Sequence, residues 1–509
     1  MRQRAVLGPR DGRLKSKGCL SCIRMKVKCD EAKPHCRRCQ RARRCCPGYR
    51  HQTQETFIFR MENSNRPPFH KTDVRQPLTL PPCYSSPPTH SLHEDWLQAA
   101  VCRFFHHFVV TPSAGSHGFL EFLPQLYSAT RPPWLCLRRS VEAISMASLA
   151  QAKHMSVKYL LMAREAYGEA LRQLHQALSC SSEATPPAVL TTICLLWKYD
   201  IIMGEGRCTH ADKSPHRQGQ LEVLRIRSSR SADTCTTSNS EEWIDHSALA
   251  IVCMQSLTCS LVPEATPTSD IPLLPITSST YACVEPVAIL RKILLPQLAA
   301  TINTVASGLA ERTPTADEIV RHASQLLNLH RQLKRWEVSL PERLRYESMP
   351  RAVSRQHNRR FPFPPFYILF PGVSVAAIWI AYWLARLSLL RNLTLILSHW
   401  HRANGLPSIS LPDIRADMQS VAGSICSSVP HLIGDVDDNG NMNPSADSQG
   451  QGLGALFATR ALYMTAQLRC MSDEQVVWML DRMEFIGQEM GIRQALVLRE
   501  EVMSKRLAE

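Results

Sequence analysis

The most constraining feature of the chain is a repeated cysteine spacing close to its N-terminus. Two cysteines separated by two residues are followed, after six more residues, by a third, and this arrangement then repeats after a further six residues. The cysteines in this pattern are Cys19, Cys22, Cys29, Cys36, Cys39 and Cys46. One tetrahedral Zn²⁺ takes four ligands, whereas two ions need eight positions, which six thiolates supply if two of them bridge. The spacing therefore predicts two structural zinc ions.

The same region carries most of the net charge. The formal charge of the chain is +15, and its first 50 residues contain 16 of the 59 basic residues and 3 of the 44 acidic residues. A charge of this sign and density indicates a polyanionic partner, first of all nucleic acid. The N-terminal sequence MRQRAVLGPRDGR has no apolar segment, so we expect no secretory signal and no disulfides. Clustered cysteines in a reduced compartment favour metal binding.

The segment CLSCIRMKVKCDEAKPHCRRCQRARRCCPGY resembles the binuclear-cluster domain of fungal Zn₂Cys₆ transcription regulators. The resemblance implies that Cys19 and Cys36 bridge the two ions. The remaining ligands would be Cys22 and Cys29 for one ion, and Cys39 and Cys46 for the other. Cys45 would shorten the last interval to five residues, below the six found in the family, so Cys46 is the expected ligand.

The resemblance also implies a way of reading double-stranded DNA. In the family, a lysine at the end of the first cluster helix meets a CGG triplet in the major groove, and Lys26 stands at its position. A lysine on guanine is a base-edge contact that discriminates by about 1–3 kcal/mol. Ile23 and Met25 stand where many relatives have basic residues, which predicts weaker phosphate binding. The expected phosphate contacts are Arg24, Lys28, Arg37 and Arg38.

The alternative interpretation is a zinc-held scaffold that never contacts DNA, with the rest of the chain acting as a corepressor or dimerisation module. The basic run RMKVK between Cys22 and Cys29 favours the DNA-binding interpretation, because its charges suit phosphates. Retention on DNA or heparin with a steep salt dependence would separate the two.

A proline-rich segment follows the cysteines. Seven prolines lie between Arg66 and Ser91, a density that stops helices and sheets from propagating. We therefore expect a cluster domain over 15–50, a linker over 51–93 and a large all-α regulatory domain over 94–509. Apolar residues at helical spacing predict helices at 96–108, 160–178, 187–197 and 319–336, and capping boxes predict helix starts at Ser91 and Ser472. The expected loops are Gly204–Glu241, Pro263–Tyr281, Pro341–Pro365 and Asp435–Gly452.

The most apolar segment, Val373–Ala385, ends at Arg386 and has 13 residues, too few to cross a bilayer. We expect a buried core helix there and no membrane association. Its aromatic residues, together with Trp400, are expected in the core, with a small-molecule effector pocket as the alternative.

The body of the chain is similar to the fungal-specific transcription factor domain. The resemblance lies in FFHHFV with GFLEFLPQLY, AREAYGEALRQLHQAL, HRQGQLEVLRIR, WIAYWLARLSLL and MGIRQALVL. It implies an all-helical regulatory domain, in some members responsive to an effector. The sequence contains no P-loop, nucleophile elbow, G-x-G-x-x-G or H-E-x-x-H motif, so we expect no enzyme. The predicted function is a nuclear, sequence-specific regulator of RNA polymerase II transcription, either monomeric or a homodimer formed through the helical body.

Overall fold

The computed structural model describes two parts of the chain. The first comprises residues 19, 21–22, 25, 27–32, 36–42 and 46. The second comprises 95–112, 118–128, 135–152, 157–179, 187–205, 214–230, 244, 247–248, 251–252, 290, 297–298, 301–302, 315–351, 363–400, 411–442 and 450–508. The chain divides into two compact units, Met1–Thr89 and His90–Glu509, which are treated separately below.

Within its described residues the N-terminal unit contains the short helix α2 (Arg37–Arg41), and Ser21 and Cys22 are also helical. Cys36 is the N-cap of α2, and its sulfur accepts a hydrogen bond from the backbone N–H of Cys39. Five of the six predicted zinc ligands are buried, and Cys29 packs against them. The core of this unit, as far as the structure describes it, consists of cysteine side chains.

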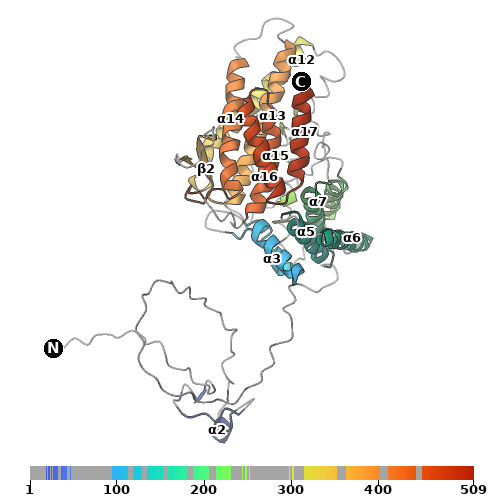
Figure 1. The fold of residues 1–509 in the computed structure, drawn as a ribbon, viewed down its shortest axis with the longest axis vertical. Coiled ribbons are helices and arrows are strands. Elements are labelled where there is room, and N and C mark those ends of the chain that lie inside the picture. The colour runs from blue at the N-terminus through green and yellow to red at the C-terminus, as the bar shows by residue number, and fades with distance from the viewer. Residues whose placement is uncertain are drawn as a thin grey trace, which may run out of the picture. The chain divides into compact units, whose positions relative to one another are not determined.

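The C-terminal unit is mostly helical (Figure 1). Its first group of helices is α3 (Trp96–Phe108), α4 (Leu123–Tyr127), α5 (Leu135–Ala152), α6 (Val157–Ser179), α7 (Pro187–Met203) and α8 (Pro215–Arg230). Its second group is α12 (Ala316–Ser339), the 3₁₀ turn η4 (Glu342–Leu344), α13 (Val373–Trp400), α14 (Leu411–Leu432), α15 (Gln451–Ala466), α16 (Asp473–Gln488) and α17 (Gln494–Ala508). In the first group, α5 packs against α3, α6 and α7, and in the second, α13 packs against α12, α14 and α15. Each group encloses its own hydrophobic core.

Local sequence signals set several of the helix starts. The predicted capping box at Ser472 is confirmed, because its hydroxyl accepts from the backbone N–H of Gln475 and the Gln475 side chain accepts from the backbone N–H of Ser472. Pro187 is the first residue of α7, as predicted. The start predicted at Ser91 lies outside the described residues, and α3 is instead capped by the carboxylate of Asp95, which accepts from two backbone N–H groups of the first turn.

The structure departs from the predictions at two places, one in a predicted loop and one in the all-α class. A helix, α8, occupies part of the predicted loop Gly204–Glu241; it has a polar sequence, so no apolar stripe signalled it. A small antiparallel sheet pairs β1 (Glu347–Pro350) with β2 (Phe366–Leu369), in a register that opposes Glu347 to Leu369 and Pro350 to Phe366. Strand β2 has the sequence FYIL and is largely buried, whereas β1 is exposed throughout. Aromatic and β-branched residues favour such a half-buried strand.

Helix α6 is placed as predicted, but one edge of its apolar stripe is not buried. Leu171 and Leu178, which the spacing assigned to the core, are 36% and 39% exposed. Three alanines and Leu174 face the core instead, because α6 lies close to α5. Small side chains allow this close approach, and the larger leucines lie at its margin.

Helix α13 extends much further than the predicted core helix. It spans 28 residues, and Val373–Leu397 is the one stretch in the described chain long and apolar enough to cross a membrane. The most apolar window of that stretch is 78% buried inside the protein, as the prediction of a core helix requires. The predicted end at Ala385 is wrong, because Arg386 stays inside the helix and lies 3.6 Å from an oxygen of Asp417 and 3.9 Å from one of Glu337.

The aromatic residues of α13 lie in the core. Trp379, Tyr382 and Trp383 are buried, and the Tyr382 ring lies 5.1 Å from that of Trp336. The Tyr382 hydroxyl donates to Glu337 over 2.7 Å. The side chain of Trp400 lies outside the described residues. An effector pocket at these rings stays a prediction.

Candidate metal centre and nucleic-acid interface

The two cysteine pairs of the N-terminal unit have the same local geometry. The backbone N–H of Cys22 donates to the sulfur of Cys19 over 3.4 Å, and the N–H of Cys39 donates to the sulfur of Cys36 over 3.3 Å. A residue that accepts from the N–H three positions later acts as the cap of a helical turn. Each C-x₂-C pair is thus a capped turn in which both sulfurs face the same side.

The two turns bring four sulfurs together. The Sγ atom of Cys19 lies 3.6 Å from that of Cys36 and 3.8 Å from that of Cys39. The Sγ atom of Cys22 lies 3.8 Å from that of Cys36 and 4.0 Å from that of Cys39. In a tetrahedral site with Zn–S bonds of about 2.3 Å, neighbouring sulfurs lie about 3.8 Å apart. These four sulfurs could therefore hold one metal ion, whereas the predicted ligand sets place Cys22 and Cys39 on different ions.

The other two predicted ligands join the same cluster. The sulfur of Cys29 accepts from the backbone N–H of Cys19 over 3.4 Å, and it forms a second possible ligand group with Asp30 and Cys36. Cys46 is buried, and its thiol interacts with that of Cys19. Cys36 is the residue that both ligand groups share, and Cys45 lies outside the described residues. All six predicted ligands thus converge, while the ligand set of each ion stays a prediction.

Proximity changes the acidity of these thiols. Enclosure raises the pKa of Cys22 to about 12. The N–H of Cys39 favours the thiolate of Cys36, but enclosure and the adjacent thiols outweigh it and raise the pKa of Cys36. The backbone N–H of Cys19 lowers the pKa of Cys29 to about 7. Thiolates this close repel one another, so a divalent cation is needed for the whole set to ionise, and zinc suits an all-thiolate site.

Hydrogen bonds connect the two cysteine arms, residues 19–30 and 36–46, at the segment that contains Lys28, one of the predicted DNA contacts. The carboxylate of Asp30 accepts from the backbone N–H of Arg37 over 3.0 Å, and the Arg38 guanidinium donates to the carbonyl of Lys28 over 3.2 Å. Asp30 is not among the predicted site residues; its position directly after the third cysteine is the signal for it in the sequence. Asp30 and Arg38 both link the first arm to α2.

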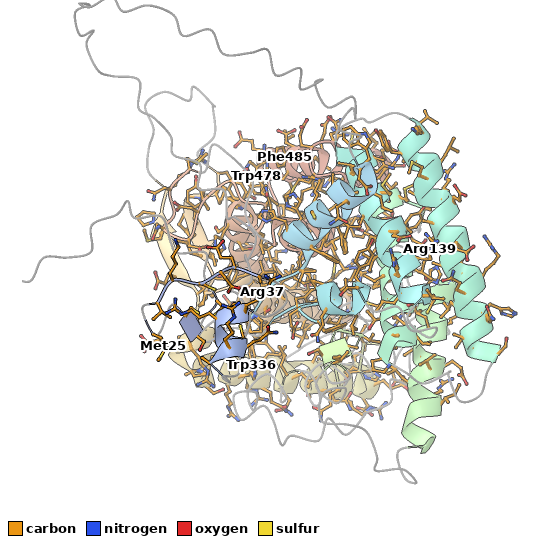
Figure 2. All side chains as sticks on the ribbon, turned by 90° about the horizontal axis from the view of Figure 1, so that it is seen from below. Met25, Arg37, Arg139, Trp336, Trp478 and Phe485 are labelled. Carbon is orange, nitrogen blue, oxygen red and sulfur yellow. The ribbon has the colours of Figure 1, made fainter. Side chains whose placement is uncertain are left out.

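The structure describes three of the five predicted DNA contacts. Lys28, Arg37 and Arg38 are exposed, whereas Arg24 and Lys26 lie outside the described residues. Figure 2 shows the side chains of Met25 and Arg37 on the N-terminal unit, and Met25 is 50% exposed. An exposed methionine between two basic positions leaves a gap in the charge of this surface.

Two curated fungal proteins are similar to part of the chain. A stretch of 207 residues, 37% of this chain, is 27% identical to 32% of the aspercryptin biosynthesis cluster-specific transcription regulator of Emericella nidulans. A stretch of 158 residues, 29% of this chain, is 28% identical to 26% of an uncharacterized transcriptional regulatory protein of Schizosaccharomyces pombe. The chain thus spans about a third or less of the length of these relatives. No family model and no solved structure matches the chain.

Both relatives carry the names of transcription regulators, and the cysteines of this chain form a cluster that can hold metal. These two findings confirm the predicted resemblance to fungal Zn₂Cys₆ transcription regulators. The relatives also give no indication of an enzyme.

Proposed function

We propose that the protein is a nuclear, sequence-specific DNA-binding regulator of RNA polymerase II transcription, with two structural zinc ions in its N-terminal unit. The observation that carries the proposal is the convergence of all six predicted cysteine ligands beside exposed basic side chains. The ions would hold the two capped turns together, and the charge concentrated in the first 50 residues would meet the phosphates of double-stranded DNA.

In this proposal, Lys26 reads guanine in a CGG-like triplet, and the neighbouring basic residues position the protein. The contacts with phosphates, which fix register and orientation without specifying sequence, would come from Arg24, Lys28, Arg37 and Arg38. Cys19 and Cys36 would be the bridging ligands, a role that agrees with the short distance between their sulfurs. The ions themselves are structural, and the chain's own lysines and arginines make the contacts with DNA.

The proposed layout is a cluster domain over 15–50, a linker over 51–93 and a regulatory domain over 94–509. The helical unit would regulate the activity of the cluster domain, in response to an effector or through formation of a homodimer. No membrane association and no enzymatic activity are proposed.

The test is a fluorescence-anisotropy titration of the full-length protein on a duplex with a CGG triplet and on a scrambled duplex. Lys26→Ala should lower the preference for the CGG duplex by about 1–3 kcal/mol, because a base contact is lost. Lys28→Ala is the matched control: it should weaken both duplexes alike and reduce the salt slope by about 0.9, the value for one phosphate contact.

Two results would contradict the proposal. Equal losses on both duplexes for Lys26→Ala would exclude its base-reading role, and binding that survives a strong chelator would exclude the role of zinc. A protein that binds zinc but neither duplex nor heparin would favour the non-DNA-binding scaffold instead.

A further inference from the structure

Two adjacent arginines of α2 have different surroundings. The guanidinium of Arg38 donates to the carbonyl oxygen of Lys28, on the other cysteine arm. Only the backbone of Arg37 is engaged: its N–H donates to Asp30, and its side chain makes no hydrogen bond or ion pair within the described part of the chain. Arg37 and Arg38, although both exposed and adjacent, are therefore expected to have different roles.

We propose that Arg38 is a positioning residue that, together with Asp30, locks the Lys28–Asp30 segment onto α2, whereas Arg37 supplies the phosphate contact. This inference rests on the proposed DNA-binding function and replaces the prediction that both arginines contact phosphate.

The lock consists of two hydrogen bonds, one accepted by Asp30 and one donated by Arg38, which run in opposite directions between the two cysteine arms. Asp30 reaches from the first arm to a backbone N–H at the start of α2, where a carboxylate also interacts favourably with the helix dipole. Arg38 reaches from α2 back to the carbonyl of Lys28, two residues before Asp30 in the chain. Together they fix both ends of this three-residue segment, which contains the ligand Cys29.

The position of this segment decides how the basic surface is presented. Lys28 is a proposed phosphate contact, and Lys26 precedes it by two residues. If the segment moves relative to α2, these lysines lose their alignment with Arg37, the proposed phosphate contact on α2. The ligand Cys29 would also shift against Cys36, with which it shares a ligand group. The lock therefore supports DNA recognition and metal retention together.

The charge of Asp30 separates the proposal from a simple electrostatic effect, because the two predict opposite changes in DNA affinity for Asp30→Ala. Asp30→Ala removes a negative charge beside a basic surface, which by charge alone should strengthen DNA binding. The lock predicts that Asp30→Ala weakens it instead, as Arg38→Ala does. One exposed hydrogen bond corresponds to about a two- to tenfold loss.

The experiment compares Arg37→Ala, Arg38→Ala, Arg38→Lys and Asp30→Ala in the full-length, zinc-loaded protein. DNA affinity is measured against salt concentration on the CGG and scrambled duplexes, and zinc release to a chromogenic chelator is timed. We expect Arg37→Ala to reduce the salt slope by about 0.9 with unchanged zinc release. Arg38→Ala and Asp30→Ala should reduce the slope by less than Arg37→Ala does, lower the preference for the CGG duplex and release zinc several-fold faster. Arg38→Lys, which retains a donor, should recover part of the loss.

A salt slope reduced by Arg38→Ala as much as by Arg37→Ala, with zinc release unchanged, would overturn the proposal. Stronger DNA binding by Asp30→Ala would also overturn it. If the wild-type protein bound no DNA, the proposed function would fail, yet the zinc-release rates would still decide the lock: faster release by Arg38→Ala and Asp30→Ala than by Arg37→Ala supports it, and equal rates refute it.

Discussion

Cys36, a proposed bridging ligand like Cys19, is a position at which a single substitution should remove both metal ions. Its sulfur lies 3.6 Å from that of Cys19 and 3.8 Å from that of Cys22, and it belongs to both ligand groups of the cluster. We expect Cys36→Ser to weaken both sites, because a bridging thiolate bonds to each ion. Cys46→Ser should weaken one site and leave the other.

The magnitude follows from the free energy of a structural zinc site, about 10–16 kcal/mol. Divided over four ligands, this gives about 2.5–4 kcal/mol for each zinc–sulfur bond, or about two to three powers of ten in affinity. Cys36→Ser removes one such bond from each ion, whereas Cys46→Ser removes one bond from one ion. The two variants therefore differ in stoichiometry as well as in affinity.

Native mass spectrometry at graded chelator concentrations measures this difference. From the proposed ligand sets we expect the wild-type protein to hold two ions, Cys46→Ser one and Cys36→Ser none. Cys102→Ser is the matched control, because Cys102 is an exposed cysteine of α3 outside the cluster and should leave both ions bound. Equal zinc content in the Cys36→Ser and Cys46→Ser proteins would refute the bridging role.

Two further predictions concern the helical unit. A Cβ atom at Gly454 would lie 2.1 Å from the carbonyl oxygen of Leu432, so Gly454→Ala should lower the free energy of unfolding in urea by about 3 kcal/mol or more. Gly168, on α6, has open space around it, so Gly168→Ala should raise that free energy by about 0.5–1 kcal/mol. Similar unfolding midpoints for the two variants would contradict this contrast. Burial, with Arg386 and Lys334 nearby, lowers the pKa of His330 from 6.5 to about 4. Between these two pH values the unfolded chain binds a proton at His330 that the folded protein does not, so the stability of the folded state falls as the pH falls from 6.5 towards 4. The melting temperature should therefore fall less over this range in His330→Gln than in the wild-type protein, and parallel curves would show that His330 is not responsible.

Features of the fold that depend on residues three or four positions apart were predictable from the sequence. The capping box at Ser472 and the first turn at Pro187 are of this kind, since both depend on contacts within one helical turn. The convergence of the cysteines was predictable for a related reason: a tetrahedral ion constrains ligand spacing strongly, so the pattern in the sequence reflects the geometry of the site.

The features that could not be predicted depend on distant partners. Arg386 marked the apparent end of the apolar segment, but the half-buried carboxylates of Asp417 on α14 and Glu337 on α12 lie beside it, so α13 continues past it. A buried arginine is tolerated when such partners are present. Leu171 fits a helical stripe and yet lies at the margin of the core, because the surroundings of α6 decide which part of the stripe is covered. The hydrogen bond from the Arg38 guanidinium to the carbonyl of Lys28 likewise depends on a partner ten residues away.

The two units also differ in what holds them together, and this difference separates their responses to metal removal. In the described part of the N-terminal unit, the buried residues are cysteines and the helix α2 has five residues, too few to be stable alone. We therefore expect most of its free energy of folding to come from metal binding. The helical unit has two extensive apolar cores that involve none of the six cluster cysteines. Chelation should therefore abolish DNA binding while the far-ultraviolet circular dichroism of the full-length protein changes little; a large loss of helical signal on chelation would mean that the helical unit depends on the metal as well.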